Sequence, residues 1–448
     1  MIESVHAAQR LDSRGNPTVQ VDVITPDGSF RAIVPSGAST GSTEAVELRD
    51  QVDGVYCGKG VETAVRHVVE VLGPALVEKR LDPATQLRDI DALMRALDGT
   101  PDKSRLGANA LLGLSMACAR AGAAAAKVPL YDFLRAEAGL SEGGLIIMPV
   151  PFFNVLNGGA HSGNAMAFQE FMVAPVGAAS MKEAVRMGAE TYHKLKKVIE
   201  REFGQAATGL GDEGGFAPPI QRPEQALDLL TTAIEEAGYQ GKIKIGIDPA
   251  SSEFYCVDND GNRSYDLGFK DKTPNRLSPG ELSALYTELL AKYPVVLLED
   301  PFAEDDWASW SEFNRHCPIE LVGDDLLTTN VERLRLAKSK EACNSMLLKV
   351  NQIGTVSEAI EANNMCAQLG WNVFVSHRSG ETTDDFIADL TVGLRAGHLK
   401  SGAPARGERV AKYNRLLDIE DEVLARGQKC PYAGAGFNSL PALGKVPK

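Results

Sequence analysis

Short apolar runs alternate with longer amphipathic segments through the C-terminal half of the chain. Six of these runs end in a polar residue, and from the second run onward the ends recur at intervals of 23 to 28 residues. Such an interval accommodates one strand, one helix and two loops. A repeated strand and helix unit is typical of a β/α barrel, so the pattern predicts that fold for this half.

The residues that end the six runs are suited to metal binding or proton transfer. They are Asp248, Glu299, Asp324, Lys349, His377 and Lys400. Functional residues at the C-terminal ends of successive barrel strands converge on one mouth. We therefore expect three carboxylates, two lysines and one histidine to meet there.

The segments between the runs carry helix-start signals. Ser278-Pro279-Gly280-Glu281 combines an N-cap, a proline at the first helical position and a capping-box glutamate. Short hydroxyl or amide side chains mark three further starts. These predicted helices run from Thr329 or Asn330 to Ala342, from Thr355 to near Gly370, and from Thr383 to near Gly397.

The N-terminal third has a different pattern. Residues 18–24 alternate between apolar and polar, 26–28 indicate a turn and 30–34 form a second apolar run, which predicts a β-hairpin. Helical patterns follow at 62–80, 83–98, 107–127 and 130–138. Strands followed by helices predict a smaller α+β domain over residues 1–139. A glycine-rich linker at 138–144 would lead to the barrel domain over residues 145–448.

Composition narrows the class of protein. The chain has 448 residues, of which 44% are hydrophobic, so it can bury a barrel of ~250 residues and a second domain. Its 60 acidic and 46 basic residues give a net charge of −14, and no basic run is present. This charge argues against nucleic acid or an anionic membrane as the main partner. The apolar segment 108–126 contains Arg120, and we expect a buried helix there and not a membrane span.

Two features predict a cytoplasmic protein. The seven cysteines are scattered, odd in number and free of any Cys-x-x-Cys pair, which favours a reducing compartment. The N-terminal segment MIESVHAAQR is polar and does not resemble a signal peptide.

The three strand-end acids predict a magnesium site. Asp248, Glu299 and Asp324 offer oxygen ligands without a cysteine or histidine beside them, a set that suits Mg²⁺ better than Zn²⁺. A single acid at a strand end can instead cap the next helix or remain solvated. Three such acids in register favour the metal.

Lys349 and Lys400 predict acid/base chemistry at the same mouth. Burial and a second nearby cation both disfavour the ammonium form, so such a lysine can act as a base near neutral pH. The alternative is a salt bridge to one of the carboxylates. The neighbouring His377-Arg378-Ser379 offers cationic and hydroxyl donors that suit a phosphate or carboxylate.

Three glycine-rich loops complete the candidate site. Glu213 lies in the loop 211–215 and Glu170 follows the loop 157–169, where both are candidates for acid/base work. The segment 35–41, PSGASTG, has the small residues of a mobile lid, which we place at 36–43. Each loop taken alone also fits an ordinary turn.

Many strings of the chain resemble those of the enolase family. They are DSRGNP, PSGASTG, LNGGAH, QEFM, GDEGGFAP, ASSEF, LEDPF, VGDD, LLKVNQIGT, SHRSGET, KSGAP and RVAKYN. The strings extend over nearly the whole chain, and several are long and specific. The resemblance implies the dehydration of 2-phosphoglycerate to phosphoenolpyruvate and water with two Mg²⁺ ions, in a homodimer or an octamer.

The resemblance also implies a role for each matching residue. Asp248, Glu299 and Asp324 match the ligands of the first Mg²⁺, and Ser39 matches a lid residue that helps to bind the second. Lys349 matches the base that takes the C2 proton. The other matches are Lys400 for the substrate carboxylate, Glu213 for the acid that assists the leaving hydroxyl, Glu170 for its partner, Gln169, His161, His377 and Ala38 for other site residues, and Arg378 with Ser379 for the phosphate.

Departures from the family strings leave the substrate open. They are Pro249, Leu327, Thr328, Ser401, Ala405 and Gly407. The changes beside Lys400 could alter which acid fits. A paralogue acting on a related phosphorylated or phosphonylated hydroxy acid is one alternative, and a surface-binding role through the terminal Lys448 is another.

Overall fold

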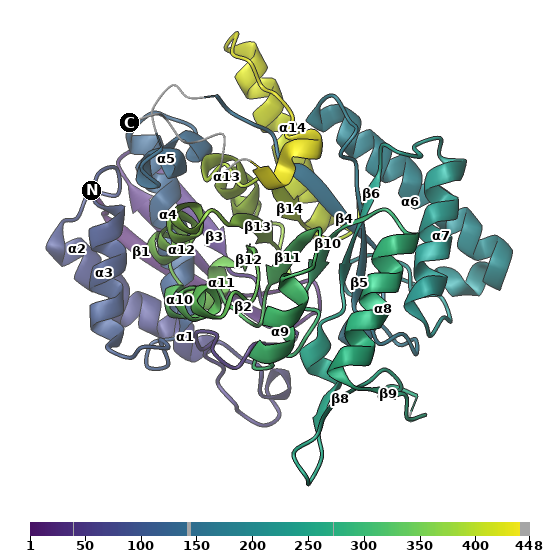
Figure 1. Cartoon of the computed structure of the whole chain (residues 1–448). Coiled ribbons are helices and arrows are strands. Elements are labelled where there is room, and N and C mark those ends of the chain that lie inside the picture. Colours follow the sequence, from purple (N-terminus) through teal and green to yellow (C-terminus); the bar gives the residue numbers. More distant parts are fainter. Residues whose placement is uncertain (39, 141–144, 272, 440–448) are drawn as a thin grey trace.

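The N-terminal domain is built on a three-stranded antiparallel sheet (Figure 1). The computed structural model describes residues 1–38, 40–140, 145–271 and 273–439. The sheet has the order β1 (Ser4–Leu11), β2 (Pro17–Thr25) and β3 (Gly28–Ile33). The predicted hairpin is confirmed as β2 and β3. Strand β1 was not predicted from the sequence. Its side chains are partly buried or exposed, and its residues show no clear alternation of apolar and polar types.

Helices pack on one side of this sheet and against the barrel. Helix α1 (Glu62–His67) continues through a π-helical turn (Val68–Leu72) into α2 (Gly73–Lys79), followed by α3 (Leu87–Asp98), α4 (Ala108–Ala125) and α5 (Leu130–Glu137). Helix α4 is buried almost throughout, between the sheet and the barrel helices α11 and α12. Among the described residues no single helix is long and apolar enough to cross a membrane. In the part of the chain that the structure describes, one pair of helices, α4 and α5, passes that test together, and the two helices are bent by 105°.

The C-terminal domain is a closed eight-stranded barrel. Around the barrel the order is β10 (Val295–Glu299), β11 (Glu320–Gly323), β12 (Ser345–Leu348), β13 (Asn372–Ser376), β14 (His398–Lys400), β4 (Val150–Asn157), β5 (Glu170–Ala174) and β6 (Lys244–Asp248). The six apolar runs of the sequence are β6 and β10 to β14. The predicted fold class, a barrel with a smaller α+β domain, is therefore confirmed.

One strand breaks the regular pattern. Strand β5 runs antiparallel to both of its neighbours, β4 and β6. The chain returns from β4 through the loop 158–169 without crossing behind the sheet, and such a direct return joins antiparallel strands. The repeated strand and helix unit therefore begins only at β6.

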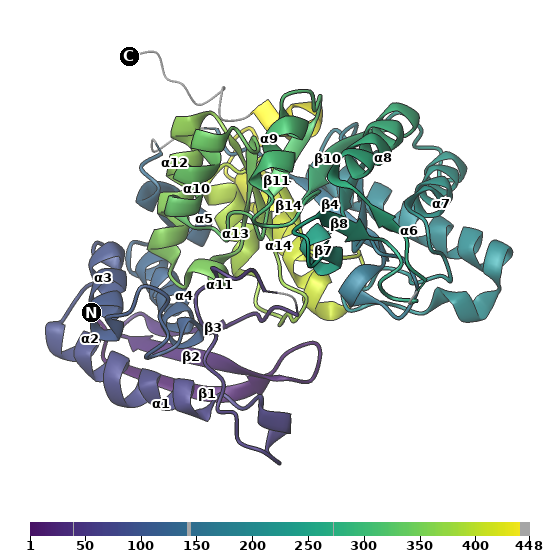
Figure 2. The ribbon, with the colours of Figure 1, turned by 60° about the horizontal axis from the view of Figure 1, so that its bottom comes forward.

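Helices surround the barrel (Figures 1 and 2). They are α6 (Met181–Phe203), α7 (Pro223–Glu236), α8 (Pro279–Lys292), α9 (Trp307–Asn314), α10 (Val331–Lys340), α11 (Val350–Ile353), α12 (Val356–Leu369), α13 (Phe386–Gly393) and α14 (Gly407–Ala425). A small sheet of β7 (Tyr255–Val257), β8 (Arg263–Asp266) and β9 (Arg276–Leu277) projects between β6 and α8.

Most predicted helix starts are confirmed and one is wrong. Ser278 forms the capping box of α8, and Asn330 and Thr355 cap α10 and α12. Thr383 does not cap α13, which begins at Phe386. Asp384 accepts the Phe386 N–H at 2.9 Å instead, because Arg120 of the N-terminal domain holds its carboxylate there.

The two domains share hydrogen bonds at the start of α12. The Val356 N–H donates to Ser115 Oγ at 3.0 Å, and the Ser357 N–H donates to Asp91 Oδ2 at 2.9 Å. Both acceptors belong to the N-terminal domain, on α4 and α3. These bonds satisfy backbone donors that an α-helix leaves unpaired at its first turn. The predicted linker at 138–144 lies partly outside the described residues.

Candidate active site

The six strand-end residues lie at one mouth of the barrel. Three of them are the last residues of their strands: Asp248, Glu299 and Lys400. The other three directly follow the last residue of their strands: Asp324, Lys349 and His377. A cavity of about 20 Å³ opens among them and two neighbouring loops. It is lined by His161, Gln169, Glu170, Glu213, Lys349, Ser376, His377, Arg378, Ser379 and Lys400.

Lys400 occupies the centre of the acidic cluster. Its Nζ lies 2.7 Å from Glu299 Oε1, 3.2 Å from Glu170 Oε2 and 3.4 Å from Asp248 Oδ2. Burial alone would lower the pKa of Lys400, but these carboxylates together raise it well above its usual value. The side chain is therefore a fixed positive charge, which suits it to hold an anion.

Lys349 forms the salt bridge that was the alternative to a base. Its Nζ lies 2.5 Å from Asp324 Oδ2. Burial, Arg378 and Lys400 lower the pKa of Lys349, while Asp324 raises it, with a net rise. Gln352 orients the same carboxylate by donating to Asp324 Oδ1 at 2.9 Å. Lys349 can accept a proton only when another positive charge takes its place beside Asp324.

A second acidic cluster joins two carboxylates and two histidines. Glu213 Oε2 lies 3.2 Å from His377 Nε2, and Glu213 Oε1 lies 3.5 Å from His161 Nδ1. Asn154 of β4 donates to Glu213 Oε2 at 2.8 Å. Glu170 Oε1 is 4.0 Å from the same His161 nitrogen.

The environments of these two carboxyls push their pKa values apart. Burial and the nearby Glu213 charge raise the pKa of Glu170 well above its usual value. Burial also opposes ionisation of Glu213, yet His377 and His161 hold the pKa of Glu213 well below its usual value. The two carboxyls therefore differ in proton affinity, an arrangement typical of acid/base sites.

The segment after β3 reaches over the mouth from the N-terminal domain (Figure 2). Ser36 and Gly380 exchange two backbone hydrogen bonds of 2.7 and 2.8 Å. The Ala38 N–H donates to Ser379 Oγ at 2.6 Å. Ser39, the predicted ligand of a second metal, lies outside the described residues. Ala38 and Ser379 thus meet where the predicted lid contacts the barrel.

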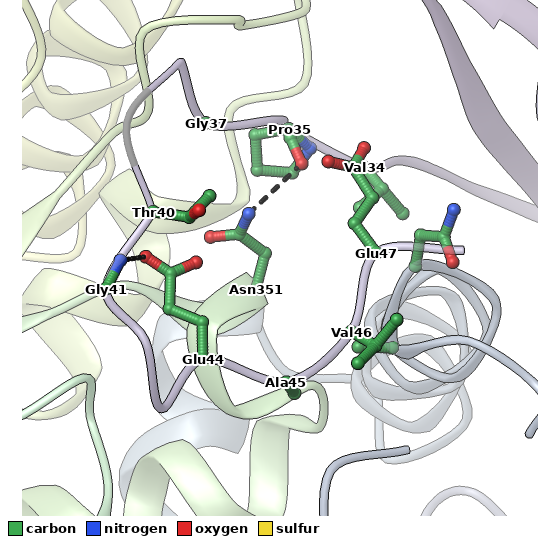
Figure 3. A pocket seen from close by; sticks show the side chains of 12 residues that line it. Val34, Pro35, Gly37, Thr40, Gly41, Glu44, Ala45, Val46, Glu47 and Asn351 are labelled. Carbon is green, nitrogen blue, oxygen red and sulfur yellow. Dashed lines mark hydrogen bonds between the residues drawn. The ribbon is translucent and has the colours of Figure 1, made fainter. Parts of the chain in front are cut away.

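A pocket of about 310 Å³ lies beneath this segment (Figure 3). Glu44 reaches from it to Arg378, with Oε2 to Nη1 at 2.9 Å, and accepts the Gly41 N–H at 3.1 Å. Asn351 of α11 donates to the Pro35 carbonyl at 3.3 Å on the opposite wall. Glu44 therefore ties the predicted lid to the predicted phosphate-binding arginine.

Sequence reasoning missed several residues of the site. Asn154, Gln352 and Glu44 each bond a predicted site residue but lie inside ordinary strand, helix or loop patterns. Gln352 lies within the family-like string LLKVNQIGT, which was the one available signal for it. Gln169 was predicted, and its Oε1 is buried without a hydrogen-bond partner in the described part of the chain.

The acidic side chains fit a divalent cation with oxygen ligands. Glu299 Oε2 is buried and has no hydrogen-bond partner among the described residues. Burial and the Asp248 charge raise the pKa of Glu299 well above its usual value, so a cation there would relieve it. One group of carboxylate oxygens, from Asp300, Asp324 and Asp325, lies within 4.8 Å of one another. Asp300 is already used, since its oxygens accept the Asp324 and Asp325 N–H groups at 2.8 Å.

The fold and the site define a barrel protein whose mouth is lined by acidic and basic side chains. Residues 2–134 match the family model of the enolase N-terminal domain, and residues 145–440 match that of the enolase C-terminal TIM barrel domain. Because these matches span nearly the whole chain, the protein belongs to the enolase family. It is a lyase of the enolase superfamily, and that family depends on a metal and acts on a small-molecule substrate.

Proposed function

We propose that the protein catalyses the Mg²⁺-dependent dehydration of 2-phospho-D-glycerate to phosphoenolpyruvate, and the reverse hydration. The proposal rests mainly on one cavity that is lined by the buried Lys400, the partly buried Lys349 and two carboxyls with opposed proton affinities. In this reaction the C2–H bond breaks and its proton passes to the enzyme. The C2–C3 double bond forms, and the C3 hydroxyl leaves as water with a second proton.

Lys349 takes the C2 proton in this proposal. It directly follows β12, and its pKa is raised because Asp324 outweighs burial, Arg378 and Lys400. In the proposal a cation bound beside Asp324 removes that stabilisation of the ammonium form and frees the amine to act as a base. Lys400 binds the substrate carboxylate, because three carboxylates keep its ammonium group charged and in place. Arg378 and Ser379 bind the phosphate.

Asp248, Glu299 and Asp324 would hold one Mg²⁺, and Ser39 would help to hold a second beside the phosphate. When bound, these ions supply positive charge that stabilises the negative charge building up on the substrate carboxylate. A C–H group next to an ionised carboxylate is otherwise a very weak acid. Closure of the segment 36–43 excludes water from the mouth.

Glu213 and Glu170 act on the leaving hydroxyl. The resemblance assigns the acid to Glu213, with Glu170 as its partner. The raised pKa of Glu170 keeps a proton within the pair while Glu213 is ionised. His161 Nδ1 lies near both carboxyls, 3.5 Å from Glu213 Oε1 and 4.0 Å from Glu170 Oε1.

Hydrogen exchange separates the two halves of the reaction. In Lys349→Ala we expect both product formation and exchange of the C2 hydrogen with solvent deuterium to be lost. In Glu213→Gln exchange continues while phosphoenolpyruvate formation falls by about 10²–10⁴-fold. Lys292→Ala changes an exposed lysine outside the mouth and is the matched control. Exchange that survives Lys349→Ala would refute its assignment as the base.

The same assay distinguishes a specialised paralogue. Faster turnover of a phosphonylated or otherwise modified hydroxy acid than of 2-phosphoglycerate would favour the paralogue. Among the departures, Ser401 is buried and follows Lys400 directly. A glycolytic role in the cytoplasm and a homodimeric or octameric assembly are part of the proposal. Lys448, the basis of a surface-binding role, lies outside the described residues.

A further inference from the structure

Arg409 of α14 is a fully buried cation that reaches the candidate site from behind. Its exposure is 0%. Nη1 lies 2.6 Å from His377 Nδ1 and donates to the Arg378 carbonyl at 2.6 Å. Nη2 donates to the carbonyls of Ser379 at 2.6 Å and Asp212 at 3.0 Å. One guanidinium group thus contacts both loops that carry His377 and Glu213.

The contact with His377 determines where the proton of that ring lies. A guanidinium group offers donors and no acceptor, so His377 Nδ1 must be the acceptor. A neutral imidazole that accepts at Nδ1 carries its proton on Nε2. Nε2 is the atom that faces Glu213 Oε2 at 3.2 Å. The ring therefore presents an N–H to Glu213.

The backbone contacts hold the two loops at a fixed separation. Asp212 and Ser379 belong to different loops, and both of their carbonyls accept from the same Arg409 nitrogen. The loop after Lys400 joins them, because the Ala403 N–H donates to the Glu213 carbonyl at 2.9 Å. A methyl group at Gly402 would lie 2.7 Å from that carbonyl and 2.8 Å from Arg409 Cδ. The packing leaves little room for another arrangement.

We propose that Arg409 is a positioning residue that fixes His377 as the neutral, Nε2-protonated tautomer, so that the Nε2 proton lies on the side of the ring that faces Glu213. His377 in this arrangement is a permanent donor. It cannot take up a second proton without losing the Arg409 contact, because the incoming proton would point at the guanidinium group. The proton that reaches the leaving hydroxyl therefore comes from the carboxyl pair and not from His377.

The surrounding charges agree with a neutral ring. Burial is the main cause that lowers the pKa of His377 to about 4, and Arg409 lowers it further while Glu213 and Glu381 raise it. Arg378 is its chain neighbour, and Lys400, Glu170 and His161 line the same cavity. Removing Arg409 would therefore allow the ring to bind a proton at higher pH.

The tautomer can be read directly in the native protein. Nitrogen-15 chemical shifts of the His377 ring distinguish a protonated from an unprotonated nitrogen. We expect a protonated Nε2 and an unprotonated Nδ1 between about pH 6 and pH 8, around the usual range of histidine. A proton on Nδ1, or on both nitrogens, would overturn the proposal. This measurement does not depend on the identity of the substrate.

The catalytic consequence rests on the proposed dehydration and needs variants. In Arg409→Met we expect kcat to fall by about 10²-fold with KM changed by less than about threefold, since a misplaced group costs turnover more than binding. The acid limb of the pH–rate profile should move to higher pH. Arg409→Lys restores a cation and should recover part of kcat and shift the acid limb back.

Lys412→Met is the matched control. Lys412 is also buried on α14 and holds the loop after His377 through Glu381 Oε2 at 2.7 Å, but it does not contact the ring. Lys412→Met should leave the ring tautomer and the acid limb unchanged. An equal shift of the acid limb in both variants would mean that Arg409 only supports the loop. If Arg409→Met does not fold, the proposal is still tested by the nitrogen-15 shifts of His377 in the native protein and by the pH–rate profile of Arg409→Lys. A native Nε2 tautomer in a protein inactive on 2-phosphoglycerate would refute the proposed function alone.

Discussion

Replacement of Asp91 by asparagine should stabilise the protein, and more strongly as the pH rises. Asp91 is 1% exposed on α3 and accepts the Ser357 N–H at the start of α12. Its other oxygen, Oδ1, has no hydrogen-bond partner in the described part of the chain. Burial is the main cause that raises the pKa of Asp91 from 3.8 to about 6, although Ser357 and Ser115 lower it.

The magnitude follows from that shift. A raised pKa means that the folded protein binds the Asp91 proton more tightly than the unfolded chain does. The wild type therefore loses stability as the pH rises from about 4 to about 6, after which the loss is constant. At about 1.36 kcal/mol for each pKa unit, the loss reaches about 3 kcal/mol. The asparagine side chain of the variant does not titrate, and its oxygen can still accept the Ser357 N–H.

Urea unfolding at several pH values measures the effect. We expect the unfolding free energy of Asp91→Asn minus that of the wild type to increase by about 3 kcal/mol between about pH 4 and pH 7. The test is how this difference changes with pH. A weaker hydrogen bond from Ser357 to asparagine would shift the difference by the same amount at every pH. Asp89→Asn, on the exposed face of the same helix, controls for the loss of one negative charge. A difference that is flat or falls with pH would show that the positive end of α12 outweighs burial.

Three other predictions follow from the structure. Glu299→Gln should weaken Mg²⁺ binding in a calorimetric titration at least about tenfold, while its circular dichroism spectrum stays unchanged. Asp258→Asn on the exposed hairpin is the control and should change neither Mg²⁺ binding nor the spectrum. Proteolysis within residues 36–43 should slow when substrate and Mg²⁺ are added, and equal rates would argue against lid closure. Glu320 and His398 form a fully buried pair at 3.0 Å in the barrel floor. Replacing either alone by glutamine should cost about 3–5 kcal/mol, more than replacing both, and additive costs would deny the pairing.

The strand ends of the site were predictable because two independent signals agree there. An apolar run of fixed spacing locates each strand, and a charged residue directly after it has few structural reasons to lie there. Glu299 and Lys349 illustrate this. The capping box at Ser278 was equally local, since all of its bonds lie between Ser278 and Glu281.

Contacts that depend on the folded arrangement were beyond the sequence. Arg409 is one cation among several on α14, and its distance from His377 is set by how a helix packs behind the barrel. Strand β1 was missed because its burial is uneven. Thr383 was wrongly assigned because α13 begins only at Phe386, whose N–H donates to Asp384, a residue held by Arg120 from far away in the chain. The antiparallel direction of β5 also has no local signal in Glu170–Ala174.

That reversed strand changes which segments of the chain form the loops at the catalytic rim. Strand β5 starts at the rim with Glu170 and ends at the floor, where Ala174 pairs with Lys244 at the start of β6. Strand β6 begins at the same floor where β5 ends. Helix α6 therefore runs from the floor to the rim and α7 runs back to the floor, and the segment 204–222 between them carries Glu213 at the rim. A uniformly parallel barrel has one rim loop for each strand and helix. Here β4 and β5 share one rim loop, and the turn between α6 and α7 replaces the loop that a parallel β5 would supply. Glu170 and Glu213 lie on these two segments, so the acid/base pair depends on the order of connections as much as on the side chains.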